Sequence, residues 1–402
     1  MKSNNTNKHQ GIILLVVFIM ILSVGLAFSL YNIKGIVKTG GAAVLKAIRR
    51  ESTVSSVPSS FEKYYNSLYS SLPVSLDVFS LSQRILGKHE ARNFEVLKSD
   101  SGALYLHGKE EEIDTEGLQI MANQCEMLYN ATNEYGGHFL YVQVPYKNVG
   151  MASDLADYSG DNTEASENYR IGRIKEKGIP VLDLRDFEEC KEYYNTDHHW
   201  TTKAAFNASR IIADELQRVY GINLEGYEYY GDMSNYEPVT YNNSFLGSIG
   251  IKVGRFFAGK DDFSILKPEF DTDLTFVHKD SKKPFEYSGD FWKVFIDQDI
   301  LEDDSFNNKY SAHMHGAYVE SIINNNLAKN DYRGLLITHS YGRTMAQYMC
   351  LDYKELRYLD PQKGRYNDNY LDYIREYKPD IVIYMYNGFD AYINVGDGYW
   401  KE

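Results

Sequence analysis

Cysteine is scarce in this chain, with three residues among 402, at Cys125, Cys190 and Cys350. Three widely separated thiols can form at most one disulfide, and without the CxxC spacing of zinc ligands they predict no metal site, so we assign them no role.

Basic side chains are also fewer than acidic ones, 42 against 56, which gives a formal net charge of -14. Proteins that bind nucleic acids need clustered lysine and arginine to displace counterions from the phosphates, so no nucleic-acid partner is expected.

Residues 11–30 form a run of 20 residues that contains no charged side chain. As a helix that rises about 1.5 Å per residue, the run matches the hydrocarbon core of a bilayer, which is about 30 Å thick. We therefore predict a transmembrane anchor over residues 11–31. A cleaved signal peptide is the alternative, because Lys2 and Lys8 precede the run, but the run is longer than the apolar region of a typical signal peptide.

Charge alone gives a conflicting orientation for this anchor. Five lysines and arginines between residues 34 and 50 outnumber Lys2 and Lys8, and by the positive-inside rule they favour a cytoplasmic C-terminal side. Long domains, however, cross the membrane largely regardless of charge. We expect residues 1–10 to be a short cytoplasmic tail and the chain beyond the anchor to lie outside the cell membrane.

The rest of the chain divides into a stalk and one large domain. A basic and then serine-rich stretch over residues 32–75 predicts the stalk, and residues 76–402 predict the domain. Helical and strand patterns alternate between residues 122 and 186 and again between 334 and 386, which predicts an α/β fold with a parallel sheet covered by helices on both faces. Residues 222–333, rich in Tyr, Asn, Asp and Gly, are expected to form an irregular insertion.

The clearest helical pattern of the domain covers residues 201–221. Thr201 or Thr202 is a suitable N-cap, apolar residues recur at helical spacing, and Gly221 predicts the end of the helix. This helix directly follows the densest cluster of reactive side chains in the sequence.

That cluster is Asp197-His198-His199-Trp200, in a loop between a strand pattern and the helix. A carboxylate that accepts from one imidazole nitrogen fixes the tautomer and leaves the other nitrogen free to take a proton from a hydroxyl. Two alternatives remain from spacing alone: a capping aspartate with surface histidines, or a metal site, for which the histidine pair lacks a third ligand.

Ser340 is the candidate nucleophile. An apolar strand over residues 334–338 runs into His339-Ser340-Tyr341-Gly342 and then a helix, the context that raises a nucleophile above a sheet. Backbone N–H groups at the start of that helix are suited to bind an oxyanion. The alternative is a serine that only caps the helix.

Together these motifs resemble the DHHW family and the alginate O-acetylation proteins, which are SGNH hydrolase-like. The resemblance rests on DHHW at 197–200 followed by two threonines, and on a serine after a late buried strand. Three further stretches are similar to the family's pattern, at residues 142–149, 245–255 and 378–387. The resemblance thus covers roughly residues 120–390.

The resemblance implies a flavodoxin-like sheet in which Asp197 orients His199 and His199 activates Ser340, with no catalytic role for His198 and no metal or cofactor. The order Asp, His, Ser is permuted relative to ordinary SGNH esterases, but such triads are recognised by geometry. The implied activity is transfer of acetyl groups to hydroxyls of a cell-surface or exported polysaccharide. A multi-spanning membrane protein is the implied partner that supplies the acyl group. A carbohydrate acetyl esterase and a catalytically silent glycan-binding or scaffold protein of a polysaccharide export system are the alternatives.

The sequence departs from the family at two positions beside the serine, where the family usually has Asp and often Asn and this chain has His339 and Arg343. The oxyanion donor is therefore predicted to be a backbone N–H, that of Ser340 or Tyr341. Aromatic faces pack against sugar rings, so the side chains beside the motifs are candidates for substrate binding; these are Trp200, Tyr341, Tyr386 and Asn387.

Overall fold

The computed structural model describes residues 73–387, except for segments 108–111, 150–154, 156–161, 280–284, 304–307 and 364–368, together with scattered positions before residue 73. The chain divides into two compact units, Met1–Phe79 and Ser80–Glu402. The predicted anchor at residues 11–31 and the predicted stalk at 32–75 lie mostly outside the described residues. Among the described ones, no helix is both long enough and apolar enough to cross a bilayer.

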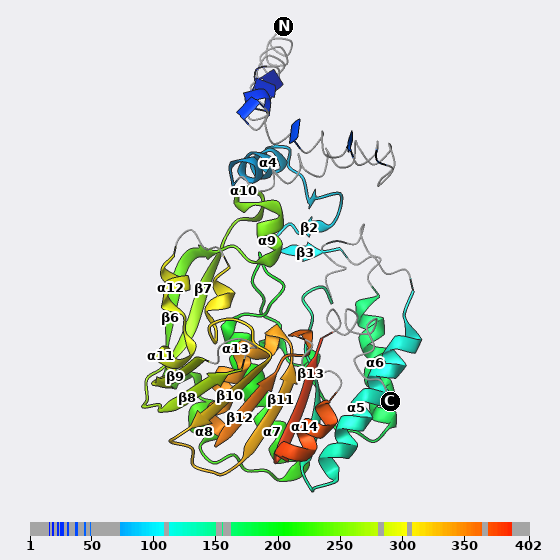
Figure 1. Ribbon diagram of the computed structural model, residues 1–402, viewed down its shortest axis with the longest axis vertical. Helices are drawn as coiled ribbons and strands as arrows, with labels where there is room; N and C mark the ends of the chain where they lie inside the picture. Colours follow the sequence, from blue (N-terminus) through cyan, green and yellow to red (C-terminus); the bar gives the residue numbers. More distant parts are fainter. Residues whose placement is uncertain are drawn as a thin grey trace. The chain divides into compact units, whose positions relative to one another are not determined.

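An eight-stranded sheet forms the centre of the second unit (Figure 1). In spatial order its strands are β5 (Val181–Asp183), β4 (His138–Gln143), β13 (Ile381–Tyr386), β11 (Arg333–Thr338), β12 (Glu355–Leu359), β10 (Glu320–Asn325), β8 (Leu274–His278) and β9 (Phe285–Gly289). The strands from β5 to β12 are parallel, whereas β10, β8 and β9 continue the sheet in antiparallel pairing. The predicted α/β class is confirmed, but the prediction of a wholly parallel sheet is wrong, because residues 222–333 supply antiparallel strands to one side of it.

Helices cover both faces of the parallel part. They are α5 (Thr115–Asn133), α6 (Thr163–Glu176) and α14 (Tyr370–Tyr377) on one face, and α7 (Thr202–Tyr220) and α13 (Ser340–Met349) on the other. Alternation along β13 explains the two layers: Val382 and Tyr384 pack with the first set of helices, Ile381 and Ile383 with the second. A strand buried on both faces needs apolar residues throughout, as the sequence of β13 has.

The ends of α7 are those predicted from sequence. The Thr201 hydroxyl caps the helix by accepting from the Ala204 amide at 3.2 Å, and Gly221 ends it in the left-handed conformation at φ +68°. Apolar side chains such as Ala205, Ile212 and Leu216 are buried along one side. This packing fixes the loop before α7 against the sheet.

The remaining elements are a hairpin, a small sheet and several further helices. A hairpin pairs β6 (Tyr236–Phe245) with β7 (Asp261–Pro268), and a three-stranded sheet contains β1 (Glu90–Ala91), β2 (Val96–Lys98) and β3 (Leu104–Leu106). The other helices are α4 (Pro73–Ile85), α8 (Tyr227–Tyr230), α9 (Ser248–Val253), α10 (Arg255–Ala258), α11 (Phe291–Phe295) and α12 (Gln298–Glu302). The segment expected to be irregular therefore contains ordered strands, several of which are rich in polar residues.

Candidate active site

Ser340 lies where β11 ends and α13 begins, at the carboxyl edge of the parallel strands, where α/β proteins hold their functional groups. His339 caps the helix, since its Nδ1 accepts from the Tyr341 amide at 3.3 Å. Gly342 lies so close to the Thr338 side chain that an added Cβ would overlap it. A glycine is therefore required for this tight turn, which leaves Ser340 half-buried at the edge of the sheet.

The loop that contains Asp197 and His199 is held from two sides. The buried ammonium of Lys147, just after β4, donates to the carbonyls of Tyr194, Asn195 and Asp197 at 2.6, 2.9 and 2.8 Å. Burial lowers the pKa of Lys147 to about 7, although the nearby carboxylates oppose that shift. Since each backbone carbonyl receives a donor, the loop is fixed without regular secondary structure.

The second support of the loop is the carboxylate of Asp261, at the start of β7. It accepts from the amides of Asn195 and Thr196 at 2.9 and 2.7 Å and from the Thr196 hydroxyl at 2.6 Å. The Thr196 hydroxyl in turn accepts from the Gly247 amide at 2.9 Å. The hairpin β6–β7 thus positions the loop through charge-assisted hydrogen bonds.

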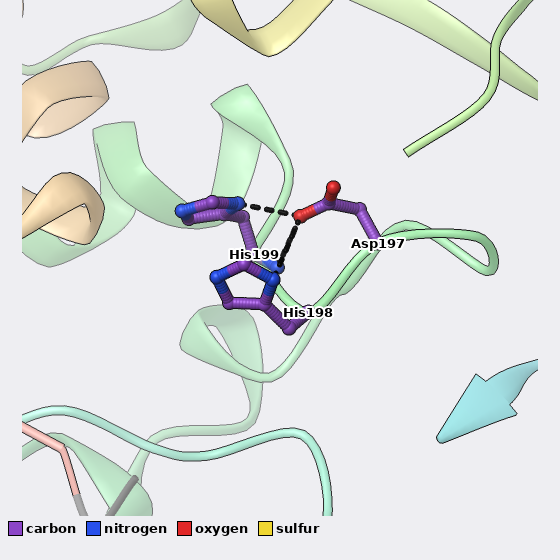
Figure 2. Close-up of side chains that lie close together, drawn as sticks. All are labelled: Asp197, His198 and His199. Carbon is purple, nitrogen blue, oxygen red and sulfur yellow. Dashed lines mark hydrogen bonds and ion pairs between the residues drawn. The ribbon is translucent and has the colours of Figure 1, made fainter. Parts of the chain in front are cut away.

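The structure brings Ser340, His199 and Asp197 together. His199 Nε2 lies 2.7 Å from Ser340 Oγ, and His199 Nδ1 lies 2.5 Å from Asp197 Oδ1. The same carboxylate oxygen accepts from the His199 backbone amide at 2.8 Å, and Figure 2 shows it facing both imidazole rings. This is the hydrogen-bond order of a serine nucleophile, a base and an orienting carboxylate.

The other oxygen of Asp197 is fixed by α9, whose first amide, that of Ser248, donates to it at 2.5 Å. The Ser248 hydroxyl lies 2.7 Å from His198 Nδ1. His198 therefore has a partner of its own beside the pair.

Aromatic side chains hold the His199 ring from the sides. Tyr310 stacks on it, with ring centroids 3.9 Å apart and planes inclined by 15°, and the Tyr310 hydroxyl donates to the Ser340 carbonyl at 3.3 Å. The Tyr341 hydroxyl donates to the His198 carbonyl, while the Trp200 indole donates to the Tyr341 carbonyl at 3.2 Å. The loop and the start of α13 are therefore locked to each other.

Burial is the largest influence on the protonation of the His199–Asp197 pair. It would raise the pKa of Asp197, but the two histidines and the donors on its oxygens outweigh it and hold that pKa well below its usual range. Burial lowers the pKa of His199; Asp197 opposes this shift, and the charges of Arg343 and His339 add to it. His199 is thus neutral at neutral pH, with Nε2 able to accept the Ser340 proton.

The same loop offers three potential metal-ligand atoms within 4.8 Å of one another, from Asp197, His198 and His199. Two ligands of a tetrahedral zinc ion, each at about 2.0 to 2.1 Å, lie about 3.3 Å apart. Asp197 Oδ1 and His199 Nδ1 are only 2.5 Å apart, which fits a charge-assisted hydrogen bond instead. The contact between Asp197 and His199 therefore fits a proton-transfer pair.

The residues predicted for substrate binding do not face an open site. Trp200, Tyr341, Tyr386 and Asn387 are all buried, with at most 3% of their surface exposed, so none of them offers an open face to a sugar. The Tyr341 amide, predicted as an oxyanion donor, is engaged by His339. The Ser340 amide is the better-placed donor, because the first amide of a helix has no acceptor within it.

Three residues that support the loop were not predicted from the sequence. Lys147 lies in the stretch 142–149, which is similar to the family's pattern, so its place after a buried strand could have marked it as a supporting residue. Asp261 and Tyr310 come from segment 222–333, where no periodic pattern or motif marks them. Only the fold brings them to the loop.

A cavity of about 540 Å³ lies beside the loop, a volume typical of small-ligand sites. Tyr193, Thr201 and Lys203 line it from the loop side, and Pro238 and Ser264 from the β6–β7 hairpin. Ser340 and His199 do not line it. It is therefore separate from the reacting atoms.

Comparison with known proteins finds one family match and solved structures of similar fold. Residues 103–237 match the family described as the SGNH hydrolase-like domain of acetyltransferase AlgX, a segment that includes the DHHW loop and ends before Ser340. No curated protein matches the chain.

Two solved structures share the fold. PatB1 of Bacillus cereus, solved with a sulfonyl adduct, is 17% identical with a TM-score of 0.59, over 76% of this chain and 96% of that one. A DHHW family protein from Eubacterium siraeum DSM 15702 is 19% identical with a TM-score of 0.52, over 76% of this chain and 92% of that one. The resemblance predicted from the sequence, to the DHHW and alginate-acetylation SGNH hydrolase-like proteins, is therefore confirmed.

Proposed function

We propose that this protein is an O-acetyltransferase that modifies hydroxyls of a cell-surface or exported polysaccharide through an acetyl-serine at Ser340. The observation that carries the proposal is the continuous hydrogen-bonded chain from Ser340 Oγ through His199 to Asp197. The matched acetyltransferase family supports acetyl as the transferred group.

In the first half-reaction, Ser340 Oγ attacks the carbonyl carbon of the acetyl donor while His199 Nε2 takes the hydroxyl proton. The tetrahedral intermediate collapses, the bond to the leaving group breaks, and His199 returns the proton to that group. Asp197 stays ionised throughout and stabilises the imidazolium that forms between the two proton transfers.

In the second half-reaction, a sugar hydroxyl attacks the acetyl-serine. His199 Nε2 removes the hydroxyl proton, the acetyl group passes to the sugar oxygen, and the proton returns to Ser340. Water in place of the sugar would give hydrolysis, so exclusion of water decides between transferase and esterase.

The proposal places the enzyme outside the cell membrane, held by residues 11–31, with a multi-spanning membrane protein as acyl donor. Its support is the uncharged run and the resemblance described above. Protease added to intact cells should degrade the domain, and protection of the domain would reject this orientation.

The test is release of acetate from an activated acetyl ester by the full-length protein. The parent and the control variant Ser288→Ala, which replaces an exposed serine on β9, should release acetate. In Ser340→Ala and His199→Ala, acetate release should fall to background. Added oligosaccharides should then gain acetyl groups at the expense of free acetate. A parent at background would favour the silent alternative, and acetate release unaffected by acceptors would favour the esterase.

A further inference from the structure

Arg343 is a buried cation for which the described residues provide no acidic partner. Its side chain lies one turn after Ser340 on α13 and is 6% exposed. Its Nε has no hydrogen-bond partner, and its Nη2 makes one long bond, at 3.4 Å, to the Tyr310 carbonyl. A buried guanidinium without a carboxylate is energetically unfavourable, so its presence calls for a functional explanation.

The contacts of Arg343 lead to His199 through one aromatic ring. The guanidinium carbon lies 5.1 Å from the centroid of the Tyr310 ring, and the same ring stacks on His199 at 3.9 Å. Ser340 and Arg343, three residues apart on a helix, share a face, and Tyr310 contacts both, through its hydroxyl and its carbonyl. Arg343, Tyr310 and His199 therefore form one connected group beside Ser340.

We propose that Arg343 is a positioning residue whose guanidinium, acting through Tyr310, holds the His199 imidazole beside Ser340 and disfavours its protonated form. The cation–π contact fixes the tyrosine ring, and the fixed ring limits rotation of the imidazole stacked on it. The positive charge repels a second positive charge on His199, which keeps the base ready to accept a proton.

Other groups also act on His199, and the test must separate them from Arg343. The charged and titratable groups around it are Asp197 and His198 on its own loop, His339, Tyr341 and Arg343 from the end of β11 and from α13, and Tyr310 and His313 from the segment around residue 310. Burial is the largest cause of the lowered pKa of His199, Asp197 opposes it, and Arg343 adds to it. Removal of Arg343 alone therefore changes one contribution and leaves the burial and the carboxylate in place.

The experiment compares Arg343→Met, which removes the charge, with Arg343→Lys, which keeps it. NMR titration of the His199 ring gives its pKa without any need for turnover, and the pH profile of acetyl-ester cleavage gives the same group during reaction. In Arg343→Met we expect the pKa of His199, and the pH at which activity is lost on the acidic side of the profile, to rise by about one pH unit. Arg343→Lys should stay close to the parent in both. Activity at pH 6 should then fall more than activity at pH 8.

A pKa and an acid limb that stay at parental values in a folded Arg343→Met protein would overturn the proposal, as would equal shifts in both variants. Thermal unfolding checks the fold, and Arg343→Gln replaces the methionine variant if that protein does not fold. The activity readout rests on the proposed acetyl transfer, but the NMR readout does not. A shifted His199 pKa without turnover would reject the proposed function and leave this inference standing.

Discussion

Replacing Gly247 by alanine should disable the site while leaving the fold intact. A Cβ on residue 247 would overlap the Cβ of Asp197 and would lie 2.5 Å from its Oδ2 and 2.8 Å from its Cα. The backbone of Gly247, at φ -72° and ψ -177°, is open to any residue, so the whole effect comes from this contact. Asp197 or the start of α9 must shift to make room.

The size of the effect follows from the geometry. Forcing an extra methyl group into a packed site costs about 1 to 3 kcal/mol, which a domain of this size tolerates. A displacement of about 1 Å in a catalytic group lowers the rate about 100-fold. Because Asp197 orients His199 from a distance of 2.5 Å, we expect acetyl-ester cleavage by Gly247→Ala to fall by at least that factor.

The assay is kcat/KM for acetyl-ester cleavage, measured alongside thermal unfolding. Gly172→Ala on α6 is the matched control, because nothing lies within 4 Å of its added Cβ and alanine favours a helix. Parental activity in Gly247→Ala would refute the claim that this carboxylate must stay where it lies, whereas a loss of folding would show that the contact is structural.

Two further predictions concern stability. Lys147→Met removes three hydrogen bonds to backbone carbonyls and should lower the free energy of unfolding in urea by about 3 kcal/mol and abolish activity; an unchanged midpoint would contradict the role of Lys147 in holding the loop. Burial lowers the pKa of His313 to about 3, below its value of about 6.5 in an unfolded chain, so its contribution to stability is present at neutral pH and is lost as pH falls below about 6.5. Between pH 6 and 4, the unfolding free energy of His313→Asn should fall less steeply with decreasing pH than that of the parent, by about 1.4 kcal/mol per pH unit. Parallel plots of unfolding free energy against pH for the two proteins would contradict this.

The parallel half of the fold could be predicted because its signals are local. Strands such as β13 are apolar throughout, helix α7 has a threonine cap and a terminal glycine, and these patterns require no knowledge of distant contacts. The antiparallel half could not, because β9 and β10 contain several polar residues and lack the continuous apolar pattern of β13. Their pairing is decided by neighbours far away in the sequence.

The candidate triad could be predicted for a related reason. Asp197 and His199 are two residues apart, and Ser340 follows a strand in a recognisable turn, so each half of the site had a sequence signature. The supporting residues had none: Asp261 and Tyr310 reach the loop only through the fold. The burial of Tyr341 and Tyr386 could not be predicted either. Tyrosine is found both in cores and at ligand sites, so the sequence around it does not show which applies.

The central claim is that Ser340 carries the acetyl group, and the most direct test is the intact mass of the full-length protein after rapid mixing with an activated acetyl ester and acid quenching. We expect a mass increase of one acetyl group that peptide mapping assigns to Ser340, and its absence from Ser340→Ala and from His199→Ala over the same reaction time. Acetyl on another residue, or turnover by Ser340→Ala at the parental rate, would contradict the assignment of Ser340 as the nucleophile.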